Sequence, residues 1–183
     1  MNENTTLFTS KREKRIWACV IFIVIGIFCS LFVGQPLLNM LKDQNLQAVI
    51  FLIGLFIIGV MIIVAGLVRR ANTIEWLLLL GISVVYIMFF LRLGLSERSH
   101  LIEYSALAIT IHQALIERAK QIGKIRFLNV YAILISIIIG IIDELVQIAL
   151  PDRVFDFEDI LFNSLASFMA IATSVGLQFI QKR

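Results

Sequence analysis

The 183-residue sequence contains little proline, cysteine or charge: two Pro, two Cys, and 16% Asp, Glu, Lys and Arg. Two cysteines exclude a framework of several disulfides, and the sequence has no Cys-x-x-Cys pair and no glycine-rich phosphate loop. Cys19 and Cys29 lie about 15 Å apart along one predicted helix, too far to form a disulfide with each other. We therefore interpret both as apolar packing residues.

Apolar residues dominate instead, since 60% of the chain is hydrophobic. A helix needs about 20 apolar residues to cross a hydrocarbon core of roughly 30 Å. No long alternation with a period of two indicates a membrane barrel, and an open sheet would leave backbone groups unpaired in lipid. The sequence predicts an all-α, polytopic membrane helical bundle with about six spans. These spans are residues 16–34, 49–68, 74–91, 100–116, 127–150 and 159–180.

Basic residues predict the orientation of these spans, because cytoplasmic loops are enriched in Lys and Arg. With both termini inside, 12 of the 16 basic residues are cytoplasmic, and the acids concentrate on the outer side. The basic balance is thus a topology signal, and nucleic-acid binding is not predicted. No small-residue cleavage site follows the first span, which predicts a retained anchor. The inner basic residues are Lys11, Arg12, Lys14, Arg15, Arg69, Arg70, Arg118, Lys120, Lys124, Arg126, Lys182 and Arg183.

Two acids fall inside the predicted fifth span. Asp143 and Glu144 lie about 11 Å before its outer end, in the negative half of the helix dipole, where end-capping does not account for them. Gln147 follows at i+4 and i+3, on the same side of the helix. One interpretation is an interhelical hydrogen-bond cluster with protonated acids. The other is a functional pocket that binds a cation, positions a headgroup or moves protons. We favour the pocket, because acids inside a membrane are costly and usually have a role.

A second polar group surrounds the turn between the fifth and sixth spans. Pro151 is expected to end the fifth helix. Arg153 either extends to the interface or binds a carboxylate or a phosphate-containing ligand. Asp156 and Asp159 either cap the sixth helix or join the polar pocket. Asn163 lies one turn further along the same stripe, where its buried amide needs partners.

The fourth predicted span begins on the same outer side. Ser99 is a candidate N-cap, and His100, Glu103 and Tyr104 form a helical stripe toward the fifth span. His100 and Glu103 could form a proton relay or supply two ligands to a divalent ion, and the pair by itself indicates no particular metal. His112 lies deeper, and we interpret it as a hydrogen-bonded packing residue.

These residues in this order resemble the VanZ-like family of bacterial membrane proteins. Over residues 76–179 the resemblance includes the segment of His100, Glu103 and Tyr104, and Ala166 replaces the glycine expected three residues after Asn163. Together with the apolar runs and the basic residues, it divides the chain into a cytoplasmic basic N-terminus (1–15), two N-terminal spans (16–72) and a VanZ-like domain of four spans (73–183). It also implies a cell-envelope location and, for some relatives, reduced susceptibility to teicoplanin-type glycopeptide antibiotics. The matching motif comprises Glu144, Gln147, Pro151, Arg153, Asp159 and Asn163.

The leading functional hypothesis is an outward-facing polar cleft that recognises a lipid-linked envelope precursor or an amphiphilic antibiotic, with membrane lipids around it. The alternatives are a membrane-embedded enzyme acting on a lipid headgroup and a proton-coupled transporter. No cofactor is predicted, and metal binding and the oligomeric state stay open. The candidate catalytic residues are His100, Glu103, Glu144 and Asp159. The candidate ligand-binding residues are Glu144, Gln147, Arg153, Asp156, Asp159 and Asn163.

Overall fold

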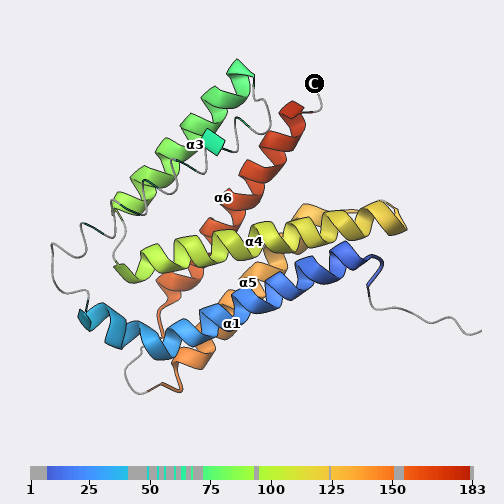
Figure 1. Ribbon diagram of the computed structural model, residues 1–183. Helices are drawn as coiled ribbons and strands as arrows, with labels where there is room; N and C mark the ends of the chain where they lie inside the picture. The colour runs from blue at the N-terminus through green and yellow to red at the C-terminus, as the bar shows by residue number, and fades with distance from the viewer. Residues whose placement is uncertain are drawn as a thin grey trace, which may run out of the picture. The chain divides into compact units, whose positions relative to one another are not determined.

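The computed structural model describes residues 8–40, 72–92, 95–123, 125–150 and 155–181, with isolated helical positions between 49 and 67. Every regular element among these residues is a helix, which confirms the all-α prediction (Figure 1). The predicted ends of the fourth, fifth and sixth spans lie within several residues of the observed ones. The helices are α1 (Lys11–Met40), α3 (Thr73–Arg92), α4 (Leu95–Ile122), α5 (Leu128–Gln147) and α6 (Phe157–Gln181).

Among the described residues, three helices are long and apolar enough to cross a membrane: Lys11–Phe32 within α1, Leu128–Gln147, and Phe157–Phe179 within α6. The apolar part of α3, Thr73–Met88, is shorter. The prediction of membrane-spanning helices is therefore supported for these three. Six spans and a cytoplasmic location of both termini stay predictions, and most of the second predicted span lies outside the described residues.

Helix α5 carries small and polar residues on its buried side and large apolar residues on its exposed side. Its exposed residues include Leu134, Ile138 and Leu145. This is the reverse of a helix in a water-soluble bundle, and it fits a lipid environment, where small residues allow helices to approach closely. The buried residues of α5 are Ala132, Ser136, Gly140, Asp143, Glu144 and Gln147.

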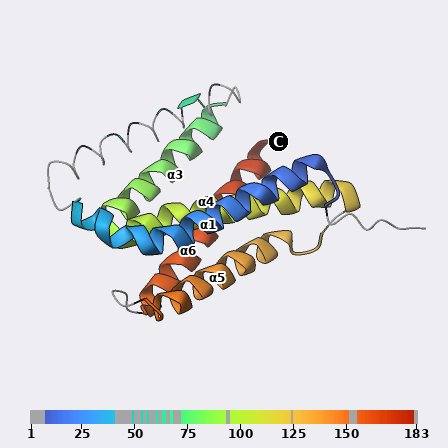
Figure 2. The ribbon, with the colours of Figure 1, turned by 60° about the horizontal axis from the view of Figure 1, so that its bottom comes forward.

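The chain divides into two compact units. The first comprises Met1–Cys29 and Leu93–Gln178, and therefore holds the beginning of α1 together with α4, α5 and almost all of α6. The second comprises Ser30–Arg92 and Phe179–Arg183 and includes α3. Within the first unit α1 and α4 run alongside each other in both ribbon views (Figures 1 and 2). All the candidate site residues that the structure describes belong to this first unit.

Two helices begin with reciprocal side-chain caps that the sequence analysis did not anticipate. Before α1, the Glu13 backbone N–H donates to Ser10 Oγ (2.9 Å), and the Glu13 carboxylate accepts from the Thr9 N–H (2.6 Å). Before α3, the backbone N–H groups of Asn72 and Glu75 each donate to the other residue's side chain. Such boxes satisfy N–H groups that have no partner inside the helix.

The structure corrects three expectations, two on helix ends and one on the cysteines. Helix α4 begins at Leu95, so Ser99 lies inside it and is not its N-cap. Helix α5 ends at Gln147, before the predicted Leu150, and the chain continues in a tighter turn whose Leu150 N–H donates to the Gln147 carbonyl. Cys19 and Cys29 are exposed, so neither packs inside the chain. Pro151, the predicted helix terminator, lies outside the described residues.

Candidate functional site

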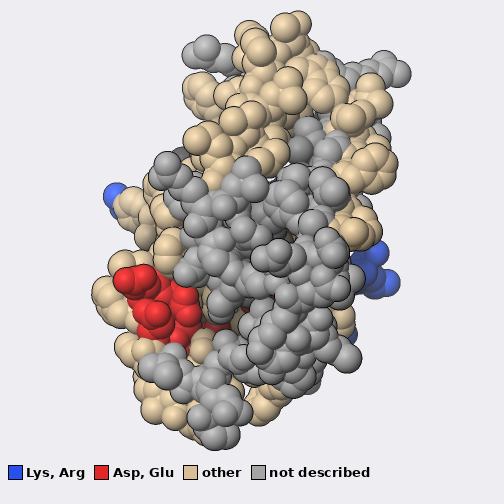
Figure 3. Space-filling model, turned by 90° about the vertical axis from the view of Figure 1, so that its left-hand side faces the viewer, with Lys and Arg blue, Asp and Glu red and all other residues tan. Residues whose placement is uncertain are grey.

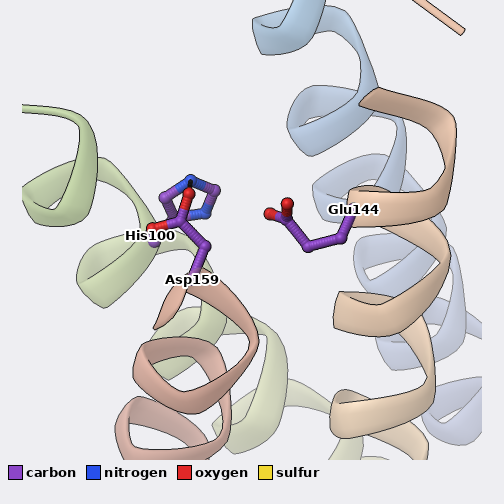
Figure 4. A group of neighbouring side chains, drawn as sticks. All are labelled: His100, Glu144 and Asp159. Carbon is purple, nitrogen blue, oxygen red and sulfur yellow. Dashed lines mark ion pairs between the residues drawn. The ribbon is translucent and has the colours of Figure 1, made fainter. Parts of the chain in front are cut away.

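Three polar side chains from three helices meet at one end of the first unit (Figure 4). His100 comes from the beginning of α4, Glu144 from the last turn of α5, and Asp159 from the first turn of α6. His100 Nε2 lies 3.7 Å from Asp159 Oδ2, and one ligand atom of each of the three residues lies within 4.8 Å of the others. His100 and Glu144 are buried, and Asp159 is half-buried. We call these three residues the acid–histidine cluster.

Glu144 is held in place from both sides. Gln147 Nε2 donates to its Oε1 (2.8 Å), which confirms the predicted pairing on one side of α5. The backbone N–H of Asp156 donates to its Oε2 (3.3 Å) and thereby connects the end of α5 to the beginning of α6. Both donors are neutral, and the Glu144 carboxylate is fully buried. A buried carboxylate with neutral donors is costly unless a positive charge or a proton is also present.

Asp143 faces α4. It is fully buried, and Tyr104 Oη donates to its Oδ2 (3.1 Å), so the two adjacent acids of α5 have different neighbours. Tyr104 lies one turn after His100 on α4, with the two ring centroids 6.1 Å apart. The predicted stripe of His100 and Tyr104 is thus directed at α5. Glu103 is half-buried and is not part of the acid–histidine cluster.

Asp156 is the N-cap of α6, which was one of the two alternatives predicted for it. Its Oδ1 accepts from the Glu158 backbone N–H (2.8 Å), and both residues are exposed. Asp159, by contrast, faces His100 in addition to lying in the first helical turn. Figure 3 shows acidic side chains gathered on one face of the molecule. Arg153, the predicted anion-binding residue, lies outside the described residues.

Asn163 lies one turn below Asp159, and Gly140 makes room for it. Asn163 is 1% exposed, and neither Oδ1 nor Nδ2 has a hydrogen-bond partner in the described part of the chain. A Cβ added to Gly140 would lie 3.3 Å from Asn163 Cβ and 3.2 Å from Tyr104 Cε1. An alanine here would require Tyr104 or Asn163 to move by a few tenths of an ångström, so the glycine favours this close approach of the three helices. The sequence analysis missed Gly140, although a glycine four residues before Glu144 on an apolar helix was the available signal.

Ala166, which stands where the family resemblance leads us to expect glycine, is fully buried. Its carbonyl accepts a hydrogen bond from Ser105 Oγ of α4 (3.5 Å). A methyl side chain is therefore accommodated at this contact between α4 and α6.

A second polar group lies at the other end of α4. Glu13 of α1 is fully buried and lies 3.6 Å from Arg118 of α4, and Arg12 lies 3.8 Å from Glu117. These pairs join α1 to α4. The sequence analysis missed this cluster, and the Ser-x-x-Glu capping pattern at Ser10 was the signal that marked Glu13.

His112 is a structural residue, which confirms its interpretation as hydrogen-bonded packing. Its Nε2 lies 2.9 Å from Asn129 Oδ1 of α5, and its Nδ1 lies 3.3 Å from Ser174 Oγ of α6. Since both ring nitrogens are engaged with other helices, His112 ties α4, α5 and α6 together below the acid–histidine cluster.

The fold and the site together define a helical protein with membrane-length helices and a buried polar cluster between three of them. No protein-family model matches the sequence, and the comparisons with curated proteins and with solved structures also found no match. The resemblance to the VanZ-like family therefore stays a prediction.

Proposed function

We propose that this chain is a VanZ-like membrane protein of the cell envelope whose polar cluster binds the polar head of a lipid-linked or amphiphilic ligand. The observation that carries the proposal is the convergence of His100, Glu144 and Asp159 between otherwise apolar helices. Lipid does not solvate such polar side chains, so their presence between apolar helices favours a role in binding. Arg153 is predicted to orient an anionic group of the ligand. Contribution to teicoplanin-type resistance is part of this proposal.

The proposed topology has six spans with both termini in the cytoplasm and the cluster on the outer side. The distribution of Lys and Arg supports it. In a background with Cys19→Ser and Cys29→Ser, we expect a Glu158→Cys variant to react with a membrane-impermeant thiol reagent in intact cells. A Gln121→Cys variant at the other end of α4 should react only after permeabilisation. Both residues are exposed, so the opposite labelling pattern would reverse the topology.

The functional test is teicoplanin susceptibility in a strain that lacks the gene and carries wild type, Glu144→Gln or Glu158→Gln. Glu144→Gln removes the charge and keeps one of the two oxygens, so one of the two donors, Gln147 Nε2 or the Asp156 N–H, loses its acceptor. Glu158→Gln is the matched control, because the same change is made at an exposed acid of the neighbouring turn. We expect wild type and the control to reduce susceptibility and Glu144→Gln to fail, at equal membrane levels. Equal susceptibility with and without the wild-type protein would refute the resistance role.

The second candidate is a membrane-embedded enzyme acting on a lipid headgroup. The separation of 3.7 Å between His100 Nε2 and Asp159 Oδ2 favours it, because a carboxylate beside an imidazole can orient a general base. Purified wild-type protein, but not the His100→Gln variant, should then convert a lipid in an extract of the cell envelope to a new species over time. Lipid that is bound and recovered unchanged would favour the binding function.

A further inference from the structure

We propose that His100, Glu144 and Asp159 form a binding site for a divalent transition-metal ion. Bonds of about 2.0 to 2.2 Å to a tetrahedral ion place two ligand atoms about 3.4 Å apart. His100 Nε2 and Asp159 Oδ2 are already 3.7 Å apart, and the Glu144 ligand atom lies within 4.8 Å of both. Figure 4 shows the Glu144 carboxylate directed toward the other two side chains. A side-chain movement of roughly 1 Å would complete the ligand set at such bond lengths.

The donor types identify the class of ion. One imidazole nitrogen with two carboxylate oxygens suits Zn²⁺, Mn²⁺ or Fe²⁺, whereas Mg²⁺ and Ca²⁺ prefer oxygen donors alone. Three protein ligands also leave a coordination position for water or for a ligand oxygen, as in sites that act on a bound molecule. The inference concerns the ion alone and stands whether or not the proposed ligand binding is correct.

Glu144 has the supporting contacts expected of a metal ligand. Metal-binding carboxylates are usually oriented by hydrogen bonds from outside the coordination shell. Gln147 and the backbone of Asp156 donate to the two oxygens of Glu144 and fix its plane. Because both donors are neutral, a bound cation would stabilise the ionised form of the Glu144 carboxylate.

Asn163 provides an independent observation. Its amide is almost completely buried, and both polar atoms have no hydrogen-bond partner among the described residues. Asn163 lies one turn after Asp159 on α6, and its Nδ2 lies beside Gly140, which is one turn before Glu144 on α5. An unsatisfied buried amide costs about 1 to 3 kcal/mol. A water on the metal ion would give this amide a partner.

The test uses purified full-length protein in detergent, stripped with a chelator and titrated with Zn²⁺, Mn²⁺ and Co²⁺. We expect one bound ion per chain, and a loss of affinity of more than about 100-fold in each of His100→Ala, Glu144→Gln and Asp159→Asn, since even outer-shell changes cost 10- to 100-fold. Glu158→Gln should bind like wild type. Variants are compared only where gel filtration shows the same monodisperse species as wild type.

A cysteine at position 100 gives a spectroscopic signal that does not depend on a loss of binding. His100→Cys, made with Cys19→Ser and Cys29→Ser, should still bind Co²⁺ and add a thiolate-to-cobalt charge-transfer band in the near ultraviolet. Absence of that band from a folded variant would refute coordination by position 100. Failure of folded wild type to bind one ion, or equal binding by the Glu144→Gln variant, would overturn the site. If wild-type protein binds no metal ion while cells carrying Glu144→Gln remain susceptible to teicoplanin, the metal site is refuted and the ligand-binding function stands.

Discussion

Replacing Gly140 by alanine tests whether the close contact of α4, α5 and α6 is required. The new Cβ would lie 3.2 Å from Tyr104 Cε1 and 3.3 Å from Asn163 Cβ. Neither neighbour yields easily, because the Tyr104 ring is fully buried with its hydroxyl bonded to Asp143, and Asn163 Cβ is attached directly to the α6 backbone. A shift of a few tenths of an ångström by Tyr104 or by the α6 backbone is therefore needed, and both are held in place.

The matched control is Gly176→Ala in α6, where an added Cβ would meet nothing within 4 Å. Both substitutions gain helix propensity, worth about 0.8 to 1.0 kcal/mol. Only Gly140→Ala adds a methyl group to a filled contact, which destabilises by about 1 to 3 kcal/mol. The free energies of unfolding of the two variants should therefore differ by about 1 to 3 kcal/mol, with Gly140→Ala the less stable.

Thermal unfolding in detergent measures this difference. For a chain of this size 1 kcal/mol shifts the midpoint by about 2 to 4 °C, so Gly140→Ala should melt about 2 to 12 °C below Gly176→Ala. If the hydroxyl of Tyr104 is displaced, the Asp143→Asn change should also have less effect in the Gly140→Ala background than in wild type. A Gly140→Ala midpoint equal to or above that of Gly176→Ala would refute the packing argument.

Three further predictions concern two side-chain contacts and one backbone conformation, and each is measured by thermal unfolding. Tyr104→Phe removes the donor to Asp143 and should destabilise the protein by about 1 to 3 kcal/mol, and no change would show that this hydrogen bond contributes nothing. A double-mutant cycle of Glu13→Gln and Arg118→Ala should give a coupling of about 0.2 to 1 kcal/mol that falls with salt, because Arg118 is half-exposed; a salt-independent coupling would contradict this. Gly123→Ala should cost about 1 kcal/mol, because φ is +97° after the end of α4, and unchanged stability would contradict that backbone conformation.

Contacts made within one helix or across one turn were predictable from the sequence. The lengths of the apolar runs indicated α4, α5 and α6, and the spacing of Glu144 and Gln147 indicated that both lie on one side of α5, where they are hydrogen-bonded. The N-cap role of Asp156 followed from its place before an apolar run. In each case the physical cause lies in neighbouring residues, so a single sequence contains it.

Contacts between distant segments were predictable only in part. The sequence indicated that His100 and Asp159 share an end of the bundle, but the earlier pairing of His100 with Glu103 was a choice based on spacing alone. Which acid faces the imidazole depends on the rotation of α6 about its axis, which spacing along one segment of sequence does not determine. The burial of Glu13 likewise depends on α4 lying against α1.

The adjacent acids of α5 bond to two different helices' residues, and we therefore expect residues inserted into this part of α5 to disrupt the fold. Asp143 accepts from Tyr104 of α4, whereas Glu144 accepts from the backbone at the start of α6. One residue inserted after Gly140 would rotate both acids by about 100° relative to that glycine. Either the glycine or the acids would then face the wrong helix. We expect insertions to be tolerated near Gly123, in the exposed connection before α5, and to abolish folding between Gly140 and Asp143.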